Sequence, residues 1–289
     1  MERTPRTITM SPARVQSLRK SGAAHKYDYG HALVLSGGPG ATGAARLAAR
    51  AALRIGAGLV TLGVPPAAQL EVAAHETAVM LKRIPDAEAL EAALRDARLT
   101  TLCLGPGFGV ARAGAHLRAA LGAPAKGVVL DADALTALAE DPALMSGLHE
   151  GCILTPHMGE FARVFPDLAE GLQAHGDVSA RSAMVRAAAA RAGCTVLLKG
   201  AETLIAAPDG GCSIHAATGA RAAPWLATAG AGDVLAGLIT GLMARGQSPL
   251  AAAETAAWLH VEAARQIGPG LIAEDLPDAL PGVLSALDV

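Results

Sequence analysis

The sequence predicts an α/β fold in which a mostly parallel central sheet carries helices on both faces. Short apolar runs alternate along the chain with longer, alanine-rich helical segments, which is the pattern of repeated strand–helix units. The runs are mostly apolar, as expected for strands that are covered on both sides. With 289 residues, of which 52% are hydrophobic and 17% charged, the chain can bury a large core.

Glycine and proline separate the elements of the first half. Gly37-Gly38-Pro39-Gly40 ends one apolar run and Gly105-Pro106-Gly107 ends another, because these residues interrupt regular structure. We expect strands at 32–35, 59–62, 101–104 and 128–130, and helices at 43–55, 86–97, 111–121 and 133–138.

The second half continues the pattern and adds a hairpin. We expect strands at 153–154 and 195–198, a hairpin of 203–206 and 212–215, helices at 159–164, 178–192, 234–244 and 249–266, and a closing segment at 273–287. No composition shift marks a linker. We therefore expect a polar N-terminal extension over residues 1–25 and a single domain over 26–289.

Composition excludes several classes of partner. The net charge is −2 and no basic stripe is present, so we expect no nucleic acid partner. No apolar stretch is long enough to span a membrane and the first 20 residues do not form a secretory signal, so we expect no membrane partner. Cys103, Cys152, Cys194 and Cys212 lie far apart, which favours buried, reduced thiols and a cytoplasmic protein.

Polar residues follow several of the predicted strands directly. Asp131, His157 and Lys199 each come after an apolar run, as do the two glycine loops. In open α/β sheets the carboxyl ends of the strands are where ligands bind. The sequence therefore predicts a site along this edge.

The segment from Leu226 to Met243, LATAGAGDVLAGLITGLM, is the strongest functional signal. Gly230, Ala231 and Gly232 would let a ligand approach the backbone, and the free N–H groups of a helix starting here would form an anion hole. A carboxylate inside such a nest suits a base that removes a proton from a hydroxyl attacking a phosphoryl group. Asp233 is that candidate; the alternative is that it only caps the helix.

Six strings together carry a family resemblance: GHALVLSGG with the helix that follows (within 30–60), LGPGFG (104–109), VLDADAL (129–135), LTPHMGEFARV (154–164), LLKGAETLIAAPDG (197–210) and LATAGAGDVLAGLITGLMARG (226–246). Over residues 25–285 the chain resembles the ADP/ATP-dependent NAD(P)H-hydrate dehydratases of the ribokinase-like superfamily. Thr42 departs from the pattern, because many relatives carry an aromatic residue there.

The resemblance implies repair of NADH or NADPH whose nicotinamide ring has taken up water at carbon 6. A nucleotide phosphorylates the added hydroxyl, phosphate leaves and the double bond returns. Bacterial members generally use ADP, so ADP is the expected donor and ATP the alternative. The expected partners are thus (6S)-NADHX or NADPHX and an adenine nucleotide, with Mg2+ as cofactor. Relatives are commonly homo-oligomers, which we also expect here.

The resemblance also assigns roles to residues. Asp233 would be the catalytic base. The substrate-binding residues would be Ala44, Gly107, His157 and Asp233. The nucleotide-binding residues would be Lys199, Gly200, Ala201, Glu202, Thr203 and Gly232. Glu160 would hold Mg2+ through water.

Each assignment has a structural alternative. His157 could cap the following helix, Lys199 could be a surface lysine, and Glu160 could simply be favoured by the helix dipole. Asp131 and Asp133 receive no catalytic role. Two other functions would use the same nest: a kinase for a small alcohol, and a nucleotide sensor without turnover.

Overall fold

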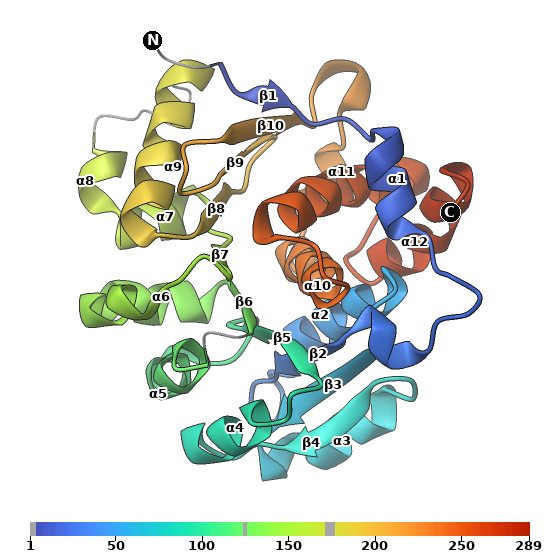
Figure 1. Ribbon diagram of the computed structural model, residues 1–289, viewed down its shortest axis with the longest axis vertical. Helices are drawn as coiled ribbons and strands as arrows, with labels where there is room; N and C mark the ends of the chain where they lie inside the picture. Colours follow the sequence, from blue (N-terminus) through green and yellow to red (C-terminus); the bar gives the residue numbers. More distant parts are fainter. Residues whose placement is uncertain (1–3, 124–125, 171–176) are drawn as a thin grey trace.

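The protein, described here by a computed structural model that covers residues 4–123, 126–170 and 177–289, is built on a ten-stranded sheet (Figure 1). The order across the sheet is β1 (Arg6–Thr7), β10 (Cys212–Ala216), β9 (Glu202–Ala206), β8 (Thr195–Leu198), β7 (Cys152–Leu154), β6 (Gly127–Leu130), β5 (Leu99–Leu104), β2 (His31–Leu35), β3 (Leu59–Val64) and β4 (Met80–Arg83).

The sheet is mostly parallel, as predicted. β9 runs antiparallel to its neighbours β8 and β10, and the remaining pairs are parallel. The antiparallel pair β9–β10 is the predicted hairpin, joined by the turn at Pro208-Asp209-Gly210. The carboxyl ends of β2, β5, β6, β7 and β8 therefore lie at one edge.

Helices cover both faces of the sheet (Figure 1). One face packs against α1 (Pro12–Leu18), α2 (Gly43–Arg54), α3 (Gln69–His75), α10 (Ala231–Ala244), α11 (Pro249–Ile267) and α12 (Asp275–Ala286). The other packs against α4 (Ala87–Leu94), α5 (Val110–Leu121), α6 (Asp133–Glu140), α7 (Met158–Val164), α8 (Pro166–Ala169) and α9 (Val178–Ala192).

Alternation along the strands explains why the apolar runs are continuous. In β2, Ala32 and Val34 belong to the core under α2 and α10. Leu33 and Leu35 belong to the core on the other face. Since successive side chains of a strand point to opposite faces, a strand between two helix layers has no solvent side.

The crossing of α10 over α2 depends on glycine. A Cβ on Gly237 would collide with the backbone of Ala48, and a Cβ on Gly241 would lie 2.6 Å from the carbonyl oxygen of Ala52. Because both positions lack a side chain, the two helices approach closely. This contact fixes the place of α10, whose first turn carries Asp233.

A topological switch lies between β2 and β5. The helix after β2, α2, packs on one face of the sheet, and the helix after β5, α5, packs on the other. At such a switch the loops of the two adjacent strands turn to opposite faces, and an open α/β sheet usually binds its ligand in the crevice there.

The chain before β2 is part of this architecture. β1 pairs in parallel with β10, and α1 packs its Leu18 into the core. The carboxylate of Glu254 in α11, with 4% of its side chain exposed, pairs with Arg6 at 2.5 Å and with Arg14. Neither β1 nor α1 was predicted, because this segment is mostly polar.

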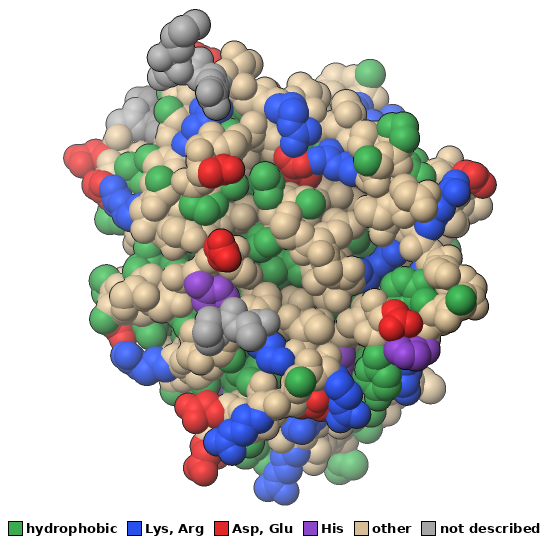
Figure 2. Space-filling model, in the orientation of Figure 1, with side chains coloured by type: hydrophobic (Ala, Val, Ile, Leu, Met, Phe, Trp, Pro, Cys, Tyr) green, Lys and Arg blue, Asp and Glu red, His purple; other side chains and the backbone are tan. Residues whose placement is uncertain are grey.

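The surface carries charges of both signs. On the face shown in Figure 2, basic and acidic side chains gather toward the lower end, over β4 and α4, and hydrophobic side chains are scattered. None of the helices within the described ranges combines the length and apolar character needed to cross a bilayer.

Candidate functional site

The site begins at the first turn of α10. Gly230 adopts a left-handed conformation (φ 88°) and precedes Ala231, the first helical residue. The Ala231 amide donates to the Thr228 carbonyl at 3.4 Å. Within the described residues, no backbone acceptor faces the amides of Gly232 and Asp233. Of the predicted anion-hole residues, Gly232 therefore has a free backbone N–H. The backbone N–H of Asp233 is free as well.

Asp233 lies in this first turn without a partner. No ion pair or side-chain hydrogen bond joins it to any residue that the structure describes. Burial, and after it the charge of Asp131, raise the pKa of Asp233 to about 6, while Lys199 lowers it. A carboxylate with a pKa near neutrality and a free face is suited to general-base chemistry.

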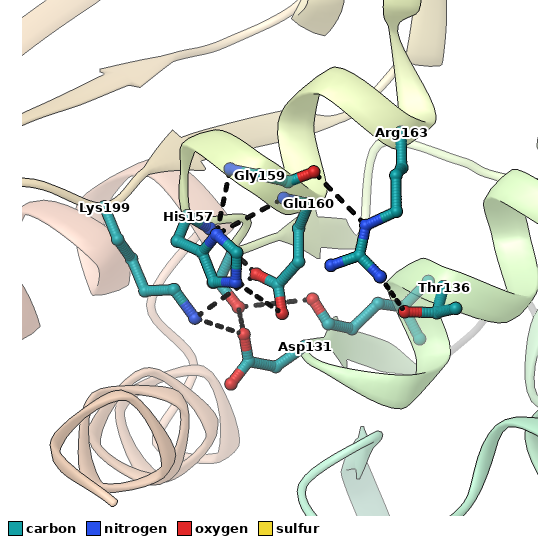
Figure 3. A network of polar contacts seen from close by, with 9 residues as sticks. Asp131, Thr136, His157, Gly159, Glu160, Arg163 and Lys199 are labelled. Carbon is teal, nitrogen blue, oxygen red and sulfur yellow. Dashed lines mark hydrogen bonds and ion pairs between the residues drawn. The ribbon is translucent and has the colours of Figure 1, made fainter. Parts of the chain in front are cut away.

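Lys199 follows β8 and points toward two carboxylates (Figure 3). Its Nζ lies 2.7 Å from Asp131 Oδ1 and 3.8 Å from Glu160 Oε2. Burial lowers the pKa of Lys199, but Asp131 and Glu160 outweigh burial and raise it. The lysine is therefore charged, and with 20% of its side chain exposed it is not a free surface residue.

Asp131 is almost completely buried, with 1% of its surface exposed. Besides Lys199, its Oδ1 accepts a hydrogen bond from Thr155 Oγ1 at 2.9 Å. Residues at the ends of β6, β7 and β8 thus meet at one point, as adjacent parallel strands require.

His157 and Glu160 cap the start of α7 reciprocally. His157 Nδ1 accepts from the amides of Gly159 (2.9 Å) and Glu160 (3.3 Å), and the His157 amide donates to Glu160 Oε2 at 2.8 Å. His157 therefore caps α7, which was the structural alternative to a binding role. Because Nδ1 is an acceptor, a neutral ring carries its proton on Nε2, on a side chain that is 54% exposed. Nε2 lies 3.6 Å from Glu160 Oε1, beyond hydrogen-bond distance.

The crevice between β2 and β5 is lined by small residues. A Cβ on Gly37 would collide with the carbonyl oxygen of Gly107, and one on Gly107 (φ 59°) would lie 3.2 Å from the Cβ of Ala44. The structure thus brings together Ala44 and Gly107, two of the predicted substrate-binding residues.

Glu71 of α3 holds the loop after β2. It accepts hydrogen bonds from the Gly40 amide at 2.8 Å and from Thr42 Oγ1 at 2.5 Å, and the Thr42 bond is the main reason that the pKa of Glu71 is lowered. Thr42, which departs from the family pattern, is buried. Sequence reasoning missed Glu71 because α3 was not predicted.

A pocket of about 450 Å³ opens beside Lys199. Its wall includes four of the predicted nucleotide-binding positions besides Lys199: Gly200, Ala201, Thr203 and Gly232. Glu202 lies outside this wall and pairs with Arg181 of α9.

The opposite wall of the pocket comes from α11, from the first turns of α10 and from the segment before α10. It includes Leu226 and Leu235, which lie in the string that starts at Leu226 but were given no role, and His260, which was not predicted. Burial lowers the pKa of His260 to about 4, so its ring is neutral. No sequence signal distinguishes these residues from ordinary core positions.

Residues 32–280 match the family model described as NAD(P)H-hydrate dehydratase. The chain belongs to this family. The bifunctional NAD(P)H-hydrate repair enzyme of Moorella thermoacetica is 41% identical over 98% of the chain, which spans 54% of that enzyme. The chain therefore covers about half the length of the bifunctional relatives. The ADP-dependent (S)-NAD(P)H-hydrate dehydratase of Xanthomonas campestris is 32% identical over 98% of the chain and 97% of the relative.

Solved structures agree with the architecture. The ADP/ATP-dependent NAD(P)H-hydrate dehydratase of Bacillus subtilis, co-crystallised with ATP and Mg2+, superposes with a TM-score of 0.76 at 28% identity, covering 97% of this chain and 99% of its own. A ribokinase-like protein of Enterococcus faecalis gives a TM-score of 0.80 at 20% identity, covering 98% and 96%. The predicted ribokinase-like α/β fold is confirmed.

Proposed function

We propose that this chain restores NADH and NADPH from their (6S)-hydrates, with ADP as phosphoryl donor. The observation that carries the proposal is the unpartnered Asp233 beside the free amides of α10, next to a pocket whose wall includes Lys199 and Gly232. Family membership and the ADP-dependent relatives support the same reaction.

The proposed chemistry has two steps. Asp233 takes the proton of the hydroxyl on carbon 6, and the oxygen attacks the terminal phosphoryl group of ADP, which releases AMP. The amides of Gly232 and Asp233 hold the charge that develops on the transferring phosphoryl group. The ring nitrogen then expels phosphate, a far better leaving group than hydroxide, and loss of the proton on carbon 5 restores the double bond.

The remaining residues orient the two ligands. Lys199, with the segment Gly200–Thr203, binds the nucleotide phosphates and the pocket wall holds the rest of the nucleotide. Ala44 and Gly107 leave room for the hydrated ring, and His157 donates from Nε2 to the dinucleotide. These assignments rest on the positions of the residues around the crevice and the pocket.

Mg2+ fits the site if nucleotide and water supply most of its ligands. No group of three or more His, Cys, Asp or Glu side chains suited to a metal occurs in the described part of the chain. Glu160 lies beside Lys199 and would hold the ion through water, as proposed from the sequence. The ion would neutralise charge on the transferring phosphoryl group.

Compartment, assembly and domain extent are also proposals. The four cysteines are free thiols, which supports the cytoplasm. Leu70 and Met80 are 87% and 51% exposed on neighbouring elements, which supports a homo-oligomer. The family match over residues 32–280 supports a single domain over 26–289, onto which β1 and α1 of the N-terminal extension pack. Light scattering after gel filtration tests the assembly.

The deciding experiment is absorbance at 340 nm with purified protein, hydrated NADH, Mg2+ and either ADP or ATP. A rise that requires nucleotide supports the dehydratase, and the faster nucleotide is the donor. A stable phosphorylated product from another alcohol, with no rise at 340 nm, would favour a kinase. Nucleotide binding without any turnover would favour a sensor.

A further inference from the structure

The turn Asp131–Ala132–Asp133, between β6 and α6, has an unusual backbone. Ala132 has φ 46° and ψ −116°, in a region that residues with a side chain rarely adopt. In the described part of the chain, Asp288 near the C-terminus is the other non-glycine residue with positive φ. Such conformations persist where surrounding contacts hold them, and they cluster at functional sites.

The strained residue sends the two carboxylates in different directions. Asp131 Oδ1 lies 2.7 Å from Lys199 Nζ, on the nucleotide side of the site. Asp133 Oδ2 accepts a hydrogen bond from the Gly109 amide at 2.8 Å. Gly109 ends the loop after β5, which carries Gly107 on the substrate side. One three-residue turn therefore contacts both halves of the site.

Asp133 is not simply a cap for its own helix. It is the first residue of α6, where Ala132 takes the N-cap position and no side chain caps the helix. Its hydrogen bond instead crosses to a loop 24 residues earlier in the chain. The backbones of the loop and the turn also lie close together, because a Cβ on Gly105 would collide with the carbonyl oxygen of Asp131.

The 105–109 loop needs the contact with the Asp131–Asp133 turn because it is rich in glycine. Gly105, Gly107 and Gly109 all have positive φ (130°, 59° and 91°), and glycine has more conformational freedom to lose than any other residue. An external acceptor for the Gly109 amide fixes the end of this loop. Gly107, which lies against Ala44, is two residues before that anchor.

We propose that Asp133 is a positioning residue for the hydrated dinucleotide, acting through Gly109 on the 105–109 loop, while Asp131 positions the nucleotide through Lys199. This inference rests on the proposed function for its substrates. The division of labour predicts that each carboxylate affects one Michaelis constant and leaves the other nearly unchanged.

The test uses Asp133→Ala, Asp133→Asn and Asp131→Asn in the full chain. Asp133→Ala is expected to raise KM for hydrated NADH about tenfold or more with KM for ADP unchanged, because a charge-assisted bond is lost. Asp133→Asn keeps an acceptor and should cost only about threefold. Asp131→Asn keeps the bond from Thr155 and should raise KM for ADP instead.

The matched control is Asp86→Ala. Asp86 accepts from the Ala89 amide at 2.9 Å at the start of α4, which is the same kind of bond in an element that lines neither the crevice nor the pocket. It should leave both Michaelis constants unchanged. An equal rise of both constants in Asp133→Ala, or no rise in either, would overturn the proposal.

Hydrogen exchange tests the anchor independently of turnover. In Asp133→Ala, the amides of 107–109 should exchange faster, while those of β8 should keep the wild-type rate. Unchanged exchange at 107–109 would refute the positioning role even if the wild type repairs hydrated NADH. If the wild type shows no repair but the loop loosens selectively, the anchor stands and the proposed function fails.

Discussion

Asp233, which is partly buried, and Glu254, which is buried, are two carboxylates with opposite surroundings. Glu254 is neutralised by two guanidinium groups, from Arg6 and Arg14. Asp233 has no partner among the described residues, and burial raises its pKa to about 6. A carboxylate that anchors a segment is paired, whereas a carboxylate that must accept a proton is left unpaired at a cost in stability.

The largest expected effect comes from Asp233→Asn. Turnover at 340 nm should fall by about two to four orders of magnitude, the usual contribution of a general base, while ADP affinity measured by calorimetry is retained. Undiminished turnover would remove Asp233 from the mechanism.

The same variant should be more stable than the wild type at pH 8. The folded pKa of Asp233 lies above its ordinary value of 3.8, so its contribution to stability is lost as the pH rises from about 4 to about 6. Asparagine does not ionise and avoids this loss, which is worth up to about 3 kcal/mol. Urea unfolding measures the gain; a less stable variant would show that Asp233 has a stabilising partner.

Glu254→Gln should have the opposite outcome. Removing one member of a buried ion pair leaves the Arg14 charge uncompensated, and typically costs about 3–5 kcal/mol. Turnover per folded molecule should stay near that of the wild type. Arg19→Ala is the control, because its partner Asp288 is 99% exposed, and it should cost less than about 1 kcal/mol. Equal stability losses in the two variants would contradict the comparison.

Lys199→Ala removes the cation in the wall of the pocket. The Kd for ADP should rise about tenfold to a hundredfold, as for other charge-assisted contacts, and the Kd for hydrated NADH should change much less. Calorimetry with each ligand separately measures both. A variant that loses affinity only for hydrated NADH would show that Lys199 belongs to the substrate side of the site and not to the nucleotide side.

The pH profile gives the smallest and most specific effect. The groups that act on Asp233 are Asp131, Lys199, Asp133 and Glu160. With a pKa near 6, the base is protonated at lower pH, so kcat/KM should fall about tenfold per unit below pH 6 and be flat above it. Unfolding curves at each pH control for stability, and a profile flat down to pH 5 would contradict the role.

The sequence predicted the layers and the edge that carries the site because β2 and β5–β8 are mostly apolar. It missed β4 and α3, since β4 ends in Lys82 and Arg83 and α3 exposes Leu70. It found Asp131 and Lys199 separately but not their pairing, which depends on strand order. The residues of α11 around His260 that line the pocket could not be predicted either, because that helix is apolar on most of its surface.

The pairing of β1 with β10 has a consequence for behaviour at high concentration. An open sheet edge presents unpaired N–H and C=O groups that can recruit another chain. Here the edge of β10 is closed by β1, extended by the Ile8 amide, which donates to the Ile214 carbonyl at 2.8 Å. Because Arg6 in this short strand is held by Glu254, the same ion pair that anchors the segment also protects the protein from edge-to-edge aggregation.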